Sequence, residues 1–190
     1  MMKEISLHLL DLLENCVKAE ATCVSLAISI DTRMDRLSVE LKDNGKGIPP
    51  AMLDKVFDPF YTTRTTRRIG LGLPLIRQTV EACEGSLTLD SHEGEGTELC
   101  FQMRYSHWDR PPMGNLVDTL LTFLIGNKYI DFYYKHDYNK SLFVFSTKDL
   151  EAELGDLGFL DQPEVYEFLR QYLWENLTAI YGGDTNEVTS

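Results

Sequence analysis

The sequence predicts an α+β protein, in which amphipathic helices alternate with β-hairpins. Three observations lead to this prediction. Residues 3–20 carry apolar side chains at helical spacing, residues 23–43 and 86–105 alternate in the manner of paired strands, and two glycines open a further helix at 70–85. With 190 residues, 43% of them hydrophobic and 25% charged, the chain is long enough for one well-cored domain with a sizeable extension.

The first helix, expected over residues 3–20, has an apolar and a polar face. Its broad apolar face holds Ile5, Leu9, Leu10, Leu12, Leu13, Cys16 and Val17. His8, Asp11, Asn15 and Lys18 follow one another at spacings of three and four on the opposite side. Such a polar stripe is typical of a solvated helix face. Because its side chains share one face, they could also converge on a ligand.

The first hairpin leads into a glycine-rich stretch, LKDNGKGIPP, at residues 41–50. Asn-Gly and Gly-x-Gly pairs are common in turns, so this stretch alone does not separate a hairpin end from a ligand site. Asp43 stands directly after the second strand, where its carboxylate could accept a hydrogen bond from an amine. A short helix is expected near residues 50–56.

A basic, loop-like segment, FDPFYTTRTTRRI, follows at residues 57–69. From Pro59 to Val80 the sequence holds four arginines and no acidic residue, although the net charge of the chain is −12. A cationic island in an acidic protein suits a small polyanion, and a solvated basic loop is the alternative. The helix at 70–85 begins at two glycines, and the free N–H groups of a helix start attract phosphate.

The second hairpin turns at HEGEGT, and the composition shifts at residues 106–114. We place a domain at 1–106, a C-terminal α/β appendage at 107–181 and a flexible tail at 182–190. The appendage is expected to form elements at 115–126, 129–136, 141–147, 148–154 and 163–178, with Asp161 as the cap of the last helix.

Composition also limits which kinds of partner, and which cellular compartment, we expect for this protein. The net charge of −12 argues against nucleic acid, and the sequence has no run of about 18 apolar residues for a membrane. The first residues carry acidic side chains among leucines, unlike a secretory signal, so a cytoplasmic protein is expected. Cys16, Cys23, Cys83 and Cys100 show no zinc-like spacing and are expected to be buried free thiols.

Four elements in order resemble the GHKL superfamily of gyrase, heat-shock chaperone, histidine kinase and MutL-type ATPases. They are the helix with Asp11 and Asn15, DNGKGI at 43–48, GLGL at 70–73 and GEGT at 94–97. The resemblance covers residues 4–103. It implies a two-layer α+β sandwich of the Bergerat type that binds ATP and Mg²⁺.

The resemblance also implies roles for individual residues. Asn15 would bind Mg²⁺ and Lys18 would meet phosphate oxygens. Asp43 would bind the adenine amino group and so select ATP over GTP, Gly45 and Gly47 would let the backbone approach the base, and Thr97 would support the adenine pocket. The phosphate end would hold Thr62, Arg64, Arg68, Gly70, Leu71 and Gly72.

Asp11 departs from the family pattern and leaves the chemistry open. Histidine kinases usually carry Asn at this position, whereas MutL, gyrase and chaperone members carry a Glu that activates water. A carboxylate at Asp11 permits general-base hydrolysis, but Asp is one methylene shorter than Glu. A role in positioning, with or without Mg²⁺, is the alternative.

The resemblance favours a stand-alone ATP- and Mg²⁺-binding regulatory or accessory subunit, with slow hydrolysis and a protein partner at the appendage or lid. No segment resembles a phosphoacceptor box, and His8 on the nucleotide helix is not expected to be a phosphoacceptor. A kinase acting in trans, of the histidine or anti-sigma serine type, is the alternative. A second alternative is a structural subunit of a larger complex, because the appendage faintly resembles the tails of small ATP-binding proteins found with hydrogenase-like subunits.

The strand and helix that usually precede the first helix are missing, so the appendage or a partner would cover the open sheet edge. The oligomeric state is left open.

Overall fold

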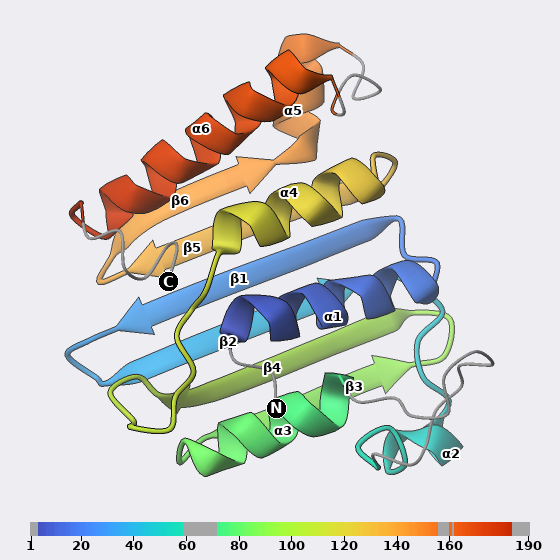
Figure 1. Ribbon diagram of the computed structural model, residues 1–190. Coiled ribbons are helices and arrows are strands. Elements are labelled where there is room, and N and C mark those ends of the chain that lie inside the picture. Colours follow the sequence, from blue (N-terminus) through green and yellow to red (C-terminus); the bar gives the residue numbers. More distant parts are fainter. Residues whose placement is uncertain (1–3, 59–71, 156–159, 161, 184–190) are drawn as a thin grey trace.

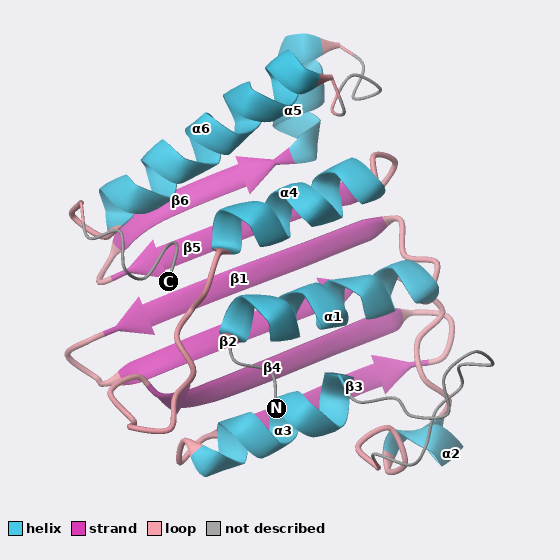
Figure 2. Cartoon of the chain, in the orientation of Figure 1, coloured by secondary structure: helices cyan, strands magenta, loops and turns pink. Residues whose placement is uncertain are grey.

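The protein folds as one mixed sheet with helices on one face (Figure 1). The computed structural model describes residues 4–58, 72–155, 160 and 162–183. Within them, six strands follow the spatial order β3-β4-β2-β1-β5-β6. Figure 2 shows α1, α3, α4 and α6 covering the same side of the strands. This arrangement confirms the predicted two-layer α+β sandwich.

The N-terminal elements follow the predicted pattern. Helix α1 spans Ile5–Lys18, and the first hairpin pairs β1 (Cys23–Asp31) with β2 (Arg36–Asp43). In both strands buried and more exposed residues alternate, because successive side chains point to opposite faces of the sheet. One face of this hairpin therefore contributes to the core and the other faces solvent.

The next elements frame one end of the sheet. Helix α2 is the short Pro50–Leu53, and α3 runs over Gly72–Ala82. Strands β3 (Ser86–His92) and β4 (Gly96–Arg104) form the second predicted hairpin, and β4 pairs antiparallel with β2. As a result, the end of β2 and the start of β4 lie side by side.

The C-terminal residues continue the same sheet. Helix α4 is Leu116–Gly126, and β5 (Asp131–Tyr138) pairs parallel with β1 and antiparallel with β6 (Ser141–Ser146). Two helices follow, α5 (Thr147–Leu154) and α6 (Pro163–Ile180). Strand β5 thus covers the edge of β1 that was expected to be open.

Buried side chains from both sides of the boundary predicted at residues 106–114 belong to one hydrophobic core. One cluster of buried apolar side chains includes Leu9 in α1, Phe132 in β5 and Leu173 in α6. Helix α6 begins after Gln162, which occupies the N-cap position without a side-chain bond, so Asp161, outside the described residues, does not occupy that position. The division into a domain at 1–106 and an appendage at 107–181 stays a prediction about independent folding.

Two predictions about side-chain environment need correction. All four cysteines are free, but only Cys16 and Cys83 are buried, whereas Cys23 is exposed and Cys100 is half-buried on the solvent face of the sheet. His8, which the helical spacing placed on the side of the first helix opposite its apolar face, is only 1% exposed. It is buried because α3 packs against that face of α1, which places its Nε2 3.3 Å from Oγ1 of Thr79.

A second buried histidine joins the last helix to the sheet. His136 in β5 is fully buried, with its Nδ1 2.6 Å from the Tyr134 hydroxyl and its Nε2 2.8 Å from the Tyr181 hydroxyl. Tyr181 directly follows α6, so this polar chain fixes the end of that helix over β5. Burial lowers the pKa of His136 to about 3 and that of His8 to about 4.

Within the described residues, no helix has both the length and the apolar character needed to cross a bilayer.

These buried histidines predict how stability depends on pH. Their folded-state pKa values lie below the ordinary value of 6.5, so the unfolded chain binds more protons than the folded chain between these values. The free energy of unfolding should be largest above pH 6.5 and should fall at pH 5 by up to about 2 kcal/mol per histidine. Urea unfolding of the protein at pH 7 and pH 5 measures the difference.

The variant His8→Gln, which keeps a donor for Thr79, should reduce this loss. His92→Gln, which replaces an exposed ring in β3, serves as the matched control and should leave the loss unchanged. Equal losses in all three proteins would contradict the assignment.

Candidate functional site

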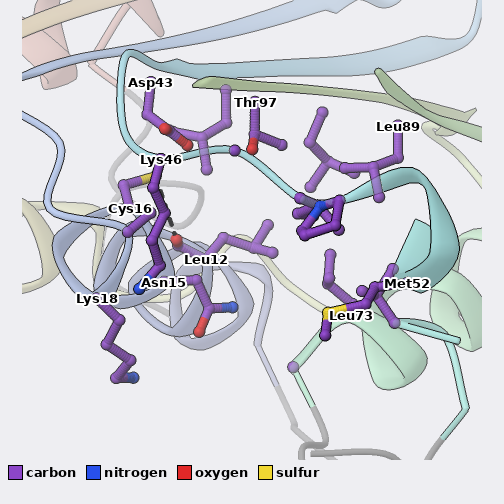
Figure 3. Close-up of a pocket in the computed structure, with 18 of the residues that line it drawn as sticks. Leu12, Asn15, Cys16, Lys18, Asp43, Lys46, Met52, Leu73, Leu89 and Thr97 are labelled. Carbon is purple, nitrogen blue, oxygen red and sulfur yellow. Dashed lines mark hydrogen bonds between the residues drawn. The ribbon is translucent and has the colours of Figure 1, made fainter. Parts of the chain in front are cut away.

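A cavity of about 310 Å³ lies between α1, the loop after β2, α2 and the start of α3 (Figure 3). Its walls are mostly apolar, with Leu12, Ile48, Met52, Leu73, Leu89 and Leu99 among them. A few polar side chains enter it, namely Asn15, Lys18, Asp43, Lys46 and Thr97. A concave apolar site with a few placed polar groups is typical of small-molecule binding.

Asp43 lies at one end of this cavity, which we call the closed end because the Asp43 side chain is buried there. It is the last residue of β2, it is only 8% exposed, and its register partner in β4 is Thr97. Its Oδ1 accepts a hydrogen bond from the Gly45 N–H at 2.8 Å, which fixes the orientation of the carboxylate. The buried Cys16 of α1 is its neighbour, and burial, followed by the nearby Asp43 charge, raises the pKa of this thiol. The thiol therefore stays protonated.

The glycines of residues 43–48 are needed for packing within the chain. A Cβ at Gly45 would stand 2.5 Å from the carbonyl oxygen of Ala19. A Cβ at Gly47 would stand 2.0 Å from the carbonyl oxygen of His92, and Gly47 has a φ of +66° that favours glycine. These close contacts explain the tight turn of the loop, and the approach of a base to the same glycines stays a prediction.

Thr97 belongs to a small hydroxyl network behind the cavity. Its Oγ1 lies 2.9 Å from Oγ of Ser91, which also contacts the N–H of Ile48 and the carbonyl of Gly96, both at 2.9 Å. Ser91 is buried and holds the loop after β2 against the β3–β4 hairpin. The network fixes the wall in which Asp43 and Thr97 lie.

Asn15 and Asp11 meet the start of α3 at the other end of the cavity, which we call the open end. A Cβ at Gly72 would stand 3.4 Å from Oδ2 of Asp11 and 3.6 Å from Nδ2 of Asn15. The helix spacing of these two residues therefore brings both to the N-terminus of α3. Because Gly72 has no side chain, the space between the two helices stays open.

Two lysines contribute positive charge to the cavity. Lys18 pairs with Glu14 one turn earlier in α1, with Nζ 3.1 Å from Oε2. Lys46 lies in the loop after β2 and points toward the side of the cavity that Asn15 occupies (Figure 3). Its backbone is held at both ends, since its N–H donates to Ala19 and its carbonyl accepts from Gly94, each at 2.8 Å.

The structure thus brings together Asp11, Asn15, Lys18, Asp43, Gly45, Gly47, Gly72 and Thr97 around one cavity or its supporting loop. The other predicted site residues, Thr62, Arg64, Arg68, Gly70 and Leu71, lie outside the described residues. Sequence reasoning missed two contributors. Lys46 sits inside the glycine motif and could have been noticed as a cation there, whereas Ser91 is an ordinary strand serine with no local signal.

A family model matches this arrangement over residues 3–107, and its description is "Histidine kinase-, DNA gyrase B-, and HSP90-like ATPase". Among curated proteins, the chain is 32% identical over 113 residues to the CAI-1 autoinducer sensor kinase/phosphatase CqsS of Vibrio cholerae. It is 33% identical over 111 residues to the sensor histidine kinase WalK of Bacillus subtilis. The matches cover 60% and 52% of this chain but only 16% and 18% of those proteins.

Among solved structures, full-length ShkA in complex with AMPPNP is 28% identical, with a TM-score of 0.44 over 53% of this chain and 21% of that one. The nucleotide-free catalytic domain of histidine kinase ThkA is 26% identical, with a TM-score of 0.42 over 52% of this chain and 64% of that one. The family model matches more than half of the chain and includes every described residue that lines the cavity. The chain therefore belongs to the histidine kinase-, DNA gyrase B- and HSP90-like ATPase family.

Proposed function

We propose that this chain is an ATP- and Mg²⁺-binding regulatory or accessory subunit of the cytoplasm that signals to a protein partner. Membership of an ATPase family supports ATP binding. The single observation that carries the proposal is the cavity itself, with the Asp43 carboxylate at its closed apolar end and Asp11 and Asn15 at the start of α3. These two ends match the two ends of a nucleotide.

The closed end suits an adenine base. Leu12, Leu89 and Leu99 offer apolar surface to a ring, and a carboxylate such as that of Asp43 accepts hydrogen bonds and does not donate them. An exocyclic amino group would satisfy it, whereas a ring carbonyl would place two acceptors against each other. In a buried site such a mismatch is costly.

The open end suits a phosphate chain with a hard cation. Asn15 offers an amide oxygen, which is a ligand type that Mg²⁺ accepts together with water and phosphate oxygens. The missing Cβ of Gly72 leaves room between this amide and the α3 N-terminus. When bound there, Mg²⁺ would neutralise part of the phosphate charge. Lys18 and Lys46 would add positive charge. The family resemblance predicts that Thr62, Arg64, Arg68, Gly70 and Leu71 also contact the phosphate chain.

Asp11 is positioned to act next to the terminal phosphate. Its carboxylate faces Gly72 and could activate a water molecule or position the groups around it. The second candidate function is a kinase acting in trans, which the sensor-kinase relatives favour. A structural subunit of a larger complex is the third, and the polar groups that line the cavity, Asn15, Asp43 and Thr97 among them, argue against it.

The first test concerns Asp43. The variant Asp43→Asn keeps an oxygen for the Gly45 N–H but loses the carboxylate, so the dissociation constant for ATP should rise about 10- to 100-fold. Isothermal titration calorimetry measures the constants. Asp90→Asn, at an exposed carboxylate of β3, is the matched control and should leave them unchanged. If Asp43→Asn and the control bind ATP equally well, the nucleotide site is elsewhere.

The second test separates the chemical outcomes with γ-labelled ATP and Mg²⁺, with and without cell extract. Phosphate release that falls about 100-fold in Asp11→Asn would support hydrolysis with Asp11 as the base. Asp90→Asn, at an exposed carboxylate of β3, is again the control and should release phosphate at the original rate. Label transferred to a protein in the extract would support the kinase instead. Tight binding without either reaction would support a switch.

The third test compares the two lysines. Lys46→Gln should weaken ATP binding by about fivefold and adenosine binding hardly at all, because only ATP carries phosphate charge. Lys18→Gln should have the smaller effect, since Glu14 already pairs with this ammonium group. The effect of Lys46→Gln should shrink as salt is raised. Lys42→Gln, paired with Glu98 on the solvent face, is the control; a fivefold loss there would point to net charge as the cause.

A further inference from the structure

Ser91 occupies an unusual place behind the cavity. It is the register partner of Thr97 across the β3–β4 hairpin, and it is only 6% exposed. It does not line the cavity, so it would not touch a bound molecule. Its hydroxyl nevertheless has three partners at 2.9 Å, which are the N–H of Ile48, the carbonyl of Gly96 and the hydroxyl of Thr97.

The donors and acceptors in this network can be assigned from chemistry alone. The Ile48 N–H can only donate, and the Gly96 carbonyl can only accept. Ser91 has one hydrogen, and giving it to Gly96 makes that contact a hydrogen bond. The remaining contact then requires that Thr97 donates to Ser91. Any other assignment would press two lone pairs together at 2.9 Å between Ser91 and Gly96.

This assignment determines what Thr97 can offer to the cavity. Its only hydrogen is directed backwards to Ser91, so its Oγ1 presents lone pairs on the cavity side, where Figure 3 shows the side chain. Asp43, its register partner in β2, is also an acceptor, with one oxygen already bonded to the Gly45 N–H. The two neighbouring groups at the closed end are therefore both acceptors.

We propose that Ser91 is a positioning residue for base specificity: it holds the Thr97 hydroxyl as an acceptor beside Asp43, so that the closed end binds an amino group and rejects a ring carbonyl. This inference rests on the proposed nucleotide binding. Adenine carries an amino group where guanine carries a carbonyl. Without Ser91 the Thr97 hydroxyl could rotate and donate to that carbonyl, so guanine would be rejected less strongly, with Asp43 alone still opposing its carbonyl.

A purely structural role for Ser91 makes a different prediction. The bond from the Ile48 N–H to Ser91 helps to hold the loop after β2, so its loss would disturb the site for every nucleotide alike. The ratio of affinities for ATP and GTP separates the two roles. A disturbed loop lowers both affinities, whereas a rotated Thr97 changes their ratio.

The experiment measures dissociation constants of the full chain for ATP, GTP and purine riboside triphosphate, which has neither the amino group nor the carbonyl. Ser91→Ala should reduce the ATP-over-GTP preference about tenfold. Ser86→Ala, on the solvent face of the same strand, should leave the preference unchanged. Thr97→Val should also reduce the preference, and in that background Ser91→Ala should have no further effect on it.

Three results would overturn the inference. One is that Ser91→Ala lowers ATP and GTP affinity by the same factor. Another is an unchanged preference in Thr97→Val, which decides the matter even if Ser91→Ala does not fold. The third is additive effects of the two substitutions on the preference. Failure of the proposed function looks different, because then the unmodified protein would bind none of the three nucleotides or Asp43→Asn would change nothing.

Discussion

The site depends on the close packing of residues 43–48 between the end of α1 and the β3–β4 turn. On one side the backbone contacts Ala19, and on the other it contacts His92 so closely that a single added carbon would stand 2.0 Å from an oxygen. Hydrogen bonds from Lys46 to Ala19 and from Gly94 to Lys46, both 2.8 Å long, hold the two sides together. Asp43 is therefore presented on a loop with little freedom to move, as selective recognition of a small polar group requires.

Helix α1 connects the two ends of the cavity. Cys16 lies beside Asp43 at the closed end, while Asn15 and Asp11 face the start of α3 at the open end. Because an α-helix is stiff over this length, Asp43 at the closed end and the start of α3 at the open end are held in one fixed relation. The buried His8, one turn before Asp11 on α1, also contacts α3, so the contact between α1 and α3 extends one turn further. The part of the polar stripe that holds His8, Asp11 and Asn15 is thus the surface on which α3 packs.

Most local elements could be predicted from the sequence, because hydrophobic periodicity and glycine positions act over a few residues. The parallel pairing of β5 with β1 could not, because strand order depends on contacts between segments about a hundred residues apart. The burial of His8 was missed for the same reason, since α3 covers it and periodicity cannot say which helix packs on a polar stripe. Ser91 was missed because its importance comes from three partners on different segments. The family motifs located Asp43, Asn15 and Thr97, but the reason for the glycines became clear only from the packing.

Residues of the C-terminal segment contact helix α1 directly. The first N–H groups of α1, at Ile5 and Ser6, donate to the carbonyls of Pro112 and Met113 at 3.0 and 2.8 Å. Helix α4 then lies beside α1, where Thr119 donates to the Ser6 carbonyl at 3.5 Å, and β5 pairs with β1 below it. Helix α1 is therefore held between α3, whose first residues line the cavity, and α4, which belongs to the C-terminal segment. Any displacement of α1 on ligand binding must be accommodated by α4, because close-packed interfaces do not deform freely. The C-terminal segment is therefore mechanically coupled to the helix that lines the cavity.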